Sequence, residues 1–212
     1  MSSVNKSNPN LVFIFSDRQR FDTLRVYGND WIRTPNINTL ADESIVFRNC
    51  YVTQPVCAPA RSSIMTGLYP HQTGVGFMTA DNKLPGYRGF LNEQCVTTAS
   101  LLQKAGYRTY LSGKWHLRGK DGVECTPTNR GFDEFYGPYH DYASFFKSEL
   151  YFRLPKTSPL KIKAKETFYA TDAISDYALE FIKDTRQRKQ PYYLYLSYNA
   201  PHFPLQAPQS EI

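Results

Sequence analysis

Three apolar runs, rich in β-branched and aromatic residues, constrain the fold of this chain most strongly. Residues 11–15 (LVFIF), 107–111 (YRTYL) and 192–198 (YYLYLSY) predict strands, and the first run is apolar at every position. A continuous apolar run of this length is typical of a strand buried on both faces of a parallel sheet. Helical patterns lie between the runs, so the order of elements predicts βαβ units. The predicted fold class is α/β, with a mostly parallel or mixed sheet flanked by helices.

Caps and apolar spacing predict the remaining elements. Helices are expected over residues 35–43 and 94–105, and a surface helix over 167–183, where apolar residues recur at helical spacing. Residues 45–47 (IVF) predict a further strand. The stretch 147–165, which combines six basic residues with two prolines, predicts an irregular insertion.

Composition indicates one globular unit. The chain has 212 residues, 41% of them apolar, and a net charge of +6, which suits either anionic substrates or a merely soluble surface. We expect a polar lead over residues 1–9 and one domain over 10–212. The apolar run 11–15 is too short for a signal peptide or a membrane span, so we expect a cytoplasmic protein without nucleic-acid or membrane partners. A periplasmic or secreted protein is expected instead if an export segment has been removed.

The chain has four cysteines without Cys-x-x-Cys spacing, which argues against a zinc site and does not require disulfides. Cys50, Cys95 and Cys125 are interpreted as structural. Cys57 differs because it precedes Pro59, Arg61 and Gly67, a pattern that predicts a short helix over residues 59–66. The positive end of that helix would face Cys57 and favour an anion there, with Arg61 on the same helix face.

Polar side chains follow three of the predicted strands. Asp17 follows the first, Lys114 and His116 the second, and His202 the last. Because ligands bind beyond the carboxyl ends of strands in open α/β sheets, we expect these residues to meet at one edge.

The spacing of Cys57, Pro59 and Arg61, followed by Thr66-Gly67, resembles the signature of the type I sulfatases of the alkaline-phosphatase-like superfamily. The runs GKWH (113–116) and APHFP (200–204) resemble two further elements of that family, and the resemblance extends from residue 10 to about residue 204. It implies a sulfatase-like fold and the hydrolysis of sulfate esters.

The resemblance also implies a mechanism. Cys57 would be oxidised to formylglycine, whose hydrated aldehyde attacks sulfur through one hydroxyl and expels sulfate through the other. Arg61 and His116 would be catalytic, His116 by a hydrogen bond to the hydrated aldehyde. Lys114 and His202 would bind the sulfate, and His202 would protonate the leaving alcohol. The evidence for a role of His71 or His140 is weaker, and His71 is interpreted either as structural or as a support behind the residues that contact the substrate.

A divalent cation is the implied cofactor, with Ca²⁺ preferred and Mg²⁺ as the alternative. Asp17 and the formylglycine at Cys57 would be ligands. Arg18 departs from the resemblance, because many sulfatases have a second acid at this position and an arginine cannot bind a cation. Further ligands of the family fall beyond Ile212, so we expect the amino-terminal part of a catalytic domain, incomplete at its C-terminus and inactive alone.

The implied partners are a small-molecule or saccharide sulfate ester and a formylglycine-generating maturase. Two other hypotheses stay open. A phosphonate monoester or phosphodiester hydrolase would use the same nucleophile, because sulfate and phosphate esters are both tetrahedral anions. A non-catalytic remnant domain would explain the missing ligands and Arg18.

Overall fold

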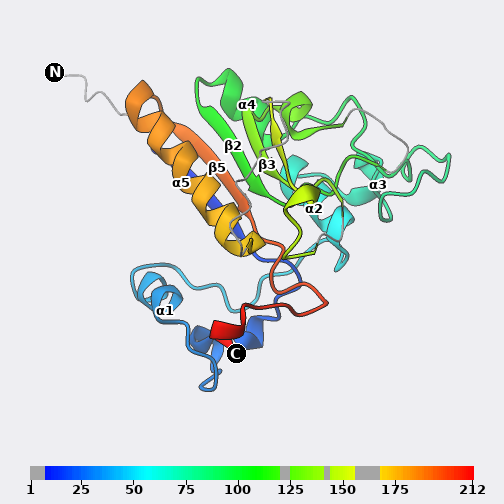
Figure 1. The fold of residues 1–212 in the computed structure, drawn as a ribbon. Helices are drawn as coiled ribbons and strands as arrows, with labels where there is room; N and C mark the ends of the chain where they lie inside the picture. The colour runs from blue at the N-terminus through cyan, green and yellow to red at the C-terminus, as the bar shows by residue number, and fades with distance from the viewer. Residues whose placement is uncertain (1–7, 120–124, 141–143, 156–167) are drawn as a thin grey trace.

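The computed structural model describes residues 8–119, 125–140, 144–155 and 168–212 and contains a five-stranded mixed sheet (Figure 1). The strand order is β1-β5-β2-β3-β4, and all neighbours are parallel except β3 and β4, which are antiparallel. The strands are β1 (Leu11–Phe15), β2 (Arg108–Gly113), β3 (Glu134–Gly137), β4 (Phe152–Leu154) and β5 (Tyr192–Ser197). The predicted α/β class is confirmed.

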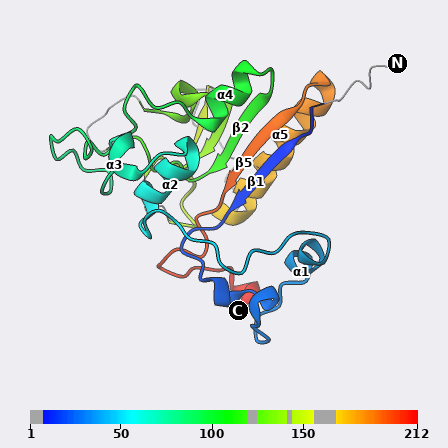
Figure 2. The ribbon, with the colours of Figure 1, turned by 180° about the vertical axis from the view of Figure 1, so that it is seen from behind.

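Helices cover both faces of this sheet. The α-helices are α1 (Pro35–Asp42), α2 (Cys57–Thr66), α3 (Pro70–Thr73), α4 (Thr98–Lys104) and α5 (Ala170–Arg188). Short 3₁₀ helices span Phe21–Thr23, Arg25–Tyr27, Pro127–Arg130, Ser148–Leu150 and Gln209–Glu211. Helix α5 lies along one face, and α2 and α4 lie on the other (Figures 1 and 2). Both views place α1 and the C-terminal residues together, beyond the carboxyl ends of the strands.

Alternation along the strands divides the buried side chains into two cores. Tyr110, Leu194 and Leu196 pack with the apolar face of α5, which presents Ala170, Ile174, Ala178 and Phe181. The intervening strand residues Leu111, Tyr193 and Tyr195 pack with residues of α2 and α4, namely Ala58, Met65 and Ala99. Because successive strand residues point to opposite faces, β2 and β5 are buried on both sides.

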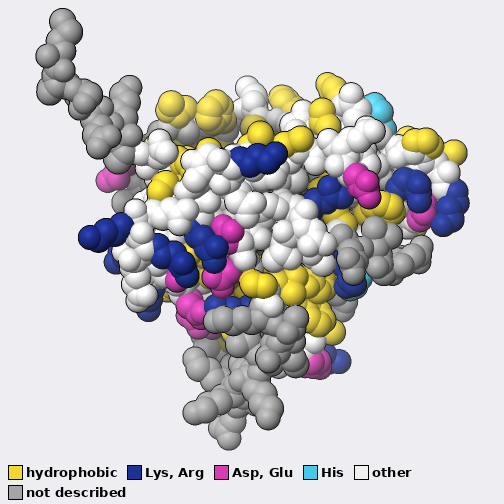
Figure 3. Space-filling view, turned by 90° about the horizontal axis from the view of Figure 1, so that it is seen from above, with side chains coloured by type: hydrophobic (Ala, Val, Ile, Leu, Met, Phe, Trp, Pro, Cys, Tyr) yellow, Lys and Arg dark blue, Asp and Glu magenta, His cyan; other side chains and the backbone are white. Residues whose placement is uncertain are grey.

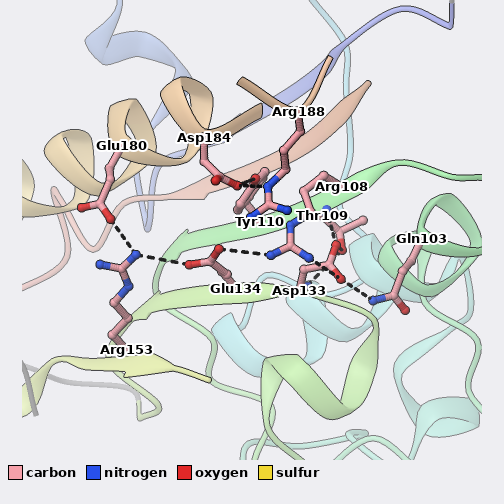
Figure 4. Close-up of polar contacts among 10 residues, drawn as sticks. All are labelled: Gln103, Arg108, Thr109, Tyr110, Asp133, Glu134, Arg153, Glu180, Asp184 and Arg188. Atoms are coloured by element: carbon pink, nitrogen blue, oxygen red, sulfur yellow. Dashed lines mark hydrogen bonds and ion pairs between the residues drawn. The ribbon is translucent and has the colours of Figure 1, made fainter. Parts of the chain in front are cut away.

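A network of charged side chains joins α5 to strands β2, β3 and β4 (Figure 4). Arg153 donates to both Glu134 and Glu180, at 3.2 and 2.6 Å, and Arg108 contacts Asp133 and Glu134. Basic and acidic side chains also lie side by side on the face that Figure 3 shows. The charges of this region are therefore largely paired with one another.

Several predicted elements change in the structure. Strand β1 is an edge strand with exposed side chains, so the expectation that it is buried on both faces is wrong for the described residues. Residues 45–47 form no strand, and Ile45 and Phe47 are exposed. An apolar run becomes a strand only where a neighbour pairs with its backbone. The predicted insertion contains β4, paired with β3, while residues 156–167 lie outside the described residues.

The predicted helices form, with shifted ends. Helix α2 begins two residues early, at Cys57, and ends at Thr66. The next residue, Gly67, caps it with a φ of 72°, the left-handed conformation that favours glycine. Helix α4 starts four residues late, because the Thr97 hydroxyl accepts a hydrogen bond from the backbone of Ser100 and caps it. All four cysteines are free, but Cys50 is exposed and is not the core residue we expected. None of the described helices has the length and apolar content that crossing a membrane requires.

Candidate functional site

The carboxyl ends of β1, β5 and β2 converge and bring the predicted site residues together. Phe15, Ser197 and Gly113 lie side by side in the register of the three strands. Beyond them, the Asp17 backbone N–H donates to Ala200 O at 3.1 Å, and the Lys114 N–H donates to Ser197 O at 2.8 Å. The predicted meeting of strand-end residues at one sheet edge is therefore seen.

Asp17, Cys57 and His202 form the group of described residues that is able to hold a metal ion. One ligand atom from each lies within 4.8 Å of the other two. Asp17 and Cys57 are buried, and the Nε2 atom of His202 is buried although the residue is half exposed. The three come from distant parts of the sequence: the end of β1, the first turn of α2 and the loop after β5.

This donor set fits a hard divalent cation only in part. The Asp17 carboxylate is the kind of oxygen ligand that Ca²⁺ and Mg²⁺ prefer, whereas a thiol is a soft ligand. An oxygen in place of the Cys57 sulfur would improve the match. Ca²⁺ takes six to eight oxygens, so these described residues supply part of a coordination shell.

Two buried cations surround the Asp17 carboxylate. Lys114 Nζ donates to Asp17 Oδ2 at 2.6 Å, and Arg61 NH2 lies 3.6 Å from the same oxygen. Burial alone would raise the pKa of Asp17, but Arg61, Lys114 and His202 outweigh it and hold that pKa below its usual value. Asp17 is therefore ionised at neutral pH, and the site combines one carboxylate with two cations.

Arg61 is held by contacts from all three strand ends. Its NH1 donates to Ser197 Oγ at 2.6 Å and to Lys114 O at 3.0 Å, and its guanidinium carbon lies 4.9 Å from the centre of the Phe15 ring. The side chain is almost completely buried. Arg61 and Cys57, both of α2, each lie near the Asp17 carboxylate.

His116 is buried two residues beyond Lys114, and its backbone N–H donates to Tyr139 O. Its φ of 56° is unusual for a residue other than glycine, a kind of strain that clusters at functional sites. Arg18 also has a left-handed backbone, with φ of 58°, but its side chain is exposed and outside the ligand group. His71 stacks on Tyr69, and His140 is exposed, so neither joins the group.

Two further polar residues belong to this region and were missed by sequence reasoning. Ser197 ends β5 and contacts Arg61, while Asn199 is buried two residues later. The Oδ1 atom of Asn199 is buried without a hydrogen-bond partner among the described residues. The available signal was their position, because Ser197 lies within the apolar run 192–198 and Asn199 directly follows it.

The fold and the site together define an α/β domain of the alkaline-phosphatase-like class, with buried cations gathered around a carboxylate. The family profile called sulfatase matches residues 9–210. The chain is 33% identical to mouse arylsulfatase J, over 95% of this chain and 34% of the relative, and 30% identical to the arylsulfatase of Klebsiella aerogenes, over 98% and 46%. The solved structure of Ps i-CgsB in complex with k-i-k-neocarrahexaose superposes with a TM-score of 0.82 and 31% identity, over 97% of this chain and 48% of that one.

This chain belongs to the sulfatase family. It spans less than half the length of the relatives named above. The signature that begins at Cys57 and the family profile therefore indicate the same family.

Proposed function

We propose that the protein hydrolyses sulfate esters with a nucleophile derived from Cys57. The observation that carries this proposal is the position of Cys57 within 4.8 Å of ligand atoms of Asp17 and His202. Arg61 and Lys114 add two buried cations on the Asp17 side of that group. Positive charge preorganised around a nucleophile is what a sulfuryl-transfer reaction needs, because charge develops on the oxygens around sulfur.

Formylglycine at position 57 would supply a hydrated aldehyde, a nucleophile that can release sulfate without a second water attacking sulfur. A divalent cation, Ca²⁺ or Mg²⁺, would be held by Asp17, by the oxygen at position 57 and beside His202, and would polarise the sulfonyl oxygens. The buried N-terminal turn of α2 supports this placement, because its free N–H groups favour negative charge at residue 57.

The chain's own residues have distinct roles in this proposal. Lys114 binds a sulfonyl oxygen through its ammonium group, and Arg61 stabilises the negative charge of the nucleophile at position 57. His202 binds the sulfate and donates a proton to the departing alcohol, because one of its ring nitrogens lies in the ligand group while the residue is half exposed. His116, buried beyond Lys114, hydrogen-bonds the hydrated aldehyde.

The proposed substrate is a small-molecule or saccharide sulfate ester, and the proposed partner is a formylglycine-generating maturase. The similarity to Ps i-CgsB, solved with k-i-k-neocarrahexaose, supports a saccharide. One observation favours a second candidate, a phosphonate monoester or phosphodiester hydrolase. The position after Asp17 carries an exposed arginine and no second carboxylate, so the cation site differs from that of many sulfatases.

The test combines mass spectrometry with turnover. The protein is expressed from its complete reading frame together with a maturase, and the peptides containing Cys57 and Cys125 are compared. We expect an aldehyde at Cys57 and an unchanged thiol at Cys125, which begins a similar run but has Asn129 where the arginine should be. An aryl sulfate should then be hydrolysed faster than an aryl phosphonate.

Cys57→Ala should abolish both reactions, while the control Cys50→Ala, at an exposed cysteine, should retain them. Turnover that survives in Cys57→Ala would refute the proposal. Faster hydrolysis of the phosphonate would favour the second candidate. An unmodified thiol without turnover would identify a non-catalytic remnant.

A further inference from the structure

We propose that Ser197 is a positioning residue that fixes the direction of the Arg61 guanidinium in the site. The inference rests on the proposed function for its kinetic consequence, but its structural content stands on contacts between these two buried side chains. Neither the signature around Cys57 nor the elements around Lys114 and His202 includes Ser197.

Ser197 lies at the centre of the three converging strands. It ends β5, pairs with Phe15 of β1 on one side and with Gly113 of β2 on the other, and has no exposed surface. Its hydroxyl oxygen accepts a hydrogen bond from Arg61 NH1 at 2.6 Å. This short contact joins residues 136 positions apart in the sequence, so it forms only when α2 packs on the completed sheet.

The geometry of the guanidinium explains why this contact sets its direction. NH1 carries two hydrogens, and both have acceptors, Ser197 Oγ at 2.6 Å and Lys114 O at 3.0 Å. Because the guanidinium is a rigid planar fork, fixing NH1 also fixes NH2, which then lies 3.6 Å from Asp17 Oδ2. That distance is an ion pair, longer than a hydrogen bond. The neutral serine and the Lys114 carbonyl, and not the carboxylate, make the directional contacts, and the serine contact is the shorter one.

The hydroxyl and the backbone carbonyl of Ser197 contact different residues of the site. The backbone carbonyl accepts from the Lys114 N–H at 2.8 Å, an approach that depends on Gly113, where a Cβ atom would lie 1.8 Å from that carbonyl oxygen. An alanine at position 197 would keep the carbonyl and remove only the hydroxyl. Ser197→Ala therefore removes one of the two acceptors of Arg61 NH1 while leaving the backbone contact to Lys114 in place.

A double-mutant cycle tests the coupling in the matured protein expressed from its complete reading frame. We expect Ser197→Ala to lower kcat/KM for an aryl sulfate by about tenfold to a hundredfold, as for a lost hydrogen bond to a charged group. The expected loss lies mainly in kcat, because Arg61 acts on the nucleophile. In Arg61→Ala the serine has no partner left, so adding Ser197→Ala should lower kcat/KM by no more than about twofold to threefold further.

The matched control is Ser112→Ala. Ser112 is equally buried, in the neighbouring strand β2, but its hydroxyl donates to Ile174 O of α5 at 2.7 Å, on the opposite face of the sheet. Its loss should lower stability and leave kcat/KM within about threefold of the wild-type value. If Ser197→Ala does not fold, Ser197→Cys takes its place, because cysteine is similar in size and accepts hydrogen bonds weakly.

A second measurement does not need turnover. In nitrogen-15 NMR spectra of arginine side chains, a guanidinium held through NH1 gives separate, slowly exchanging N–H signals. We expect those of Arg61, assigned by their loss in Arg61→Ala, to merge or exchange faster in Ser197→Ala and to persist in Ser112→Ala. A wild-type protein without turnover would refute the proposed function and leave this readout intact. Unchanged Arg61 signals in Ser197→Ala, or additive kinetic losses in the double variant, would overturn the role of Ser197.

Discussion

The Asp17 carboxylate shows how much of this site depends on single residues. It is 3% exposed and lies between two cations, Lys114 and Arg61, that are themselves buried. A buried charge is tolerated only where an opposite charge compensates for its lost hydration. The Asp17 carboxylate therefore compensates for the burial of both cations.

Asp17→Asn should destabilise the fold, because it leaves two buried cations without their carboxylate. Breaking a buried ion pair from one side costs about 3–5 kcal/mol, and we expect a loss of that size in the free energy of unfolding by urea. The control is Asp22→Asn. Asp22 pairs with Arg20, and the two side chains are 43% and 78% exposed, respectively. Exposed pairs contribute about 0–1 kcal/mol, so equal losses in the two variants would contradict this account.

The residues that the sequence predicted share one property, which is that a local pattern marks them. Asp17, Lys114 and His202 each follow an apolar strand, and Cys57 begins a helix signature. Ser197 carries no such mark, because its importance arises from a guanidinium that approaches from a helix 136 residues away. Contacts of that kind depend on tertiary packing and have no counterpart in sequence spacing.

Elements were predictable where their periodicity was long enough to be distinctive. The apolar stripe of α5 and the run that forms β5 each cover several residues, whereas β3 and β4 have four and three residues and carry no readable alternation. Strand β4 also lies in a stretch whose lysines and prolines suggested a loop. Antiparallel pairing with β3 decides its structure, and the sequence of β4 alone does not contain that partner.

Gly67 and Gly113 distinguish two costs of replacing a glycine at the end of a helix or strand: the strain of a left-handed backbone and a steric clash of the new Cβ atom. Gly67, after α2, and Gly113, which ends β2, both have positive φ, but a Cβ at Gly67 would meet nothing within 4 Å. Gly67→Ala should cost about 1–2 kcal/mol for its left-handed backbone. Gly113→Ala should cost about 1–3 kcal/mol more, because it pushes β2 away from Ser197 O. Thermal unfolding of both variants tests this, and similar losses would show that the contact at Gly113 relaxes freely.

Asp184 makes the attachment of α5 dependent on pH. A hydrogen bond from Arg188 lowers the pKa of Asp184, burial opposes this, and a further hydrogen bond from Tyr110 of β2 lowers it again, so the folded value lies below the ordinary 3.8. A depressed pKa contributes stability above the unfolded value, and this contribution is lost as pH falls through the folded value.

Asp184→Asn should therefore lower the free energy of unfolding by about 1 kcal/mol at neutral pH. The difference from the wild type should shrink as the pH falls below about 3.8, the ordinary value for an aspartate. Urea unfolding at several pH values measures this difference. Asp176→Asn, on an exposed position of the same helix, is the control and should show little difference at any pH. A constant difference for Asp184→Asn down to low pH would exclude the ionised carboxylate as its source.

At the scale of the whole molecule, the two edge strands of the sheet, β4 and β1, have different surroundings. On one side, Arg153 of the edge strand β4 is held by the charge network of Figure 4, in which it contacts Glu134 of β3 and Glu180 of α5. On the other side, no strand among the described residues pairs with the outer edge of β1, whose Leu11, Val12 and Ile14 are exposed. Further large apolar side chains of the same amino-terminal third are exposed: Trp31, Ile45, Phe47 and Tyr51. An exposed, apolar edge strand is a template for pairing with another chain.

We therefore expect the 212-residue chain to self-associate through β1, in a concentration-dependent way that sedimentation velocity measures. A lysine on the edge opposes such pairing, because it brings like charges together in the associated form. Ile14→Lys, at a side chain that is 61% exposed, should shift the chain toward the monomer without lowering its thermal stability. The control is Leu179→Lys on α5, where the side chain is 54% exposed but lies away from any strand edge. If both lysines dissociate the chain equally, general surface charge and not the β1 edge governs association. If neither does, the chain associates through another surface and not through the β1 edge.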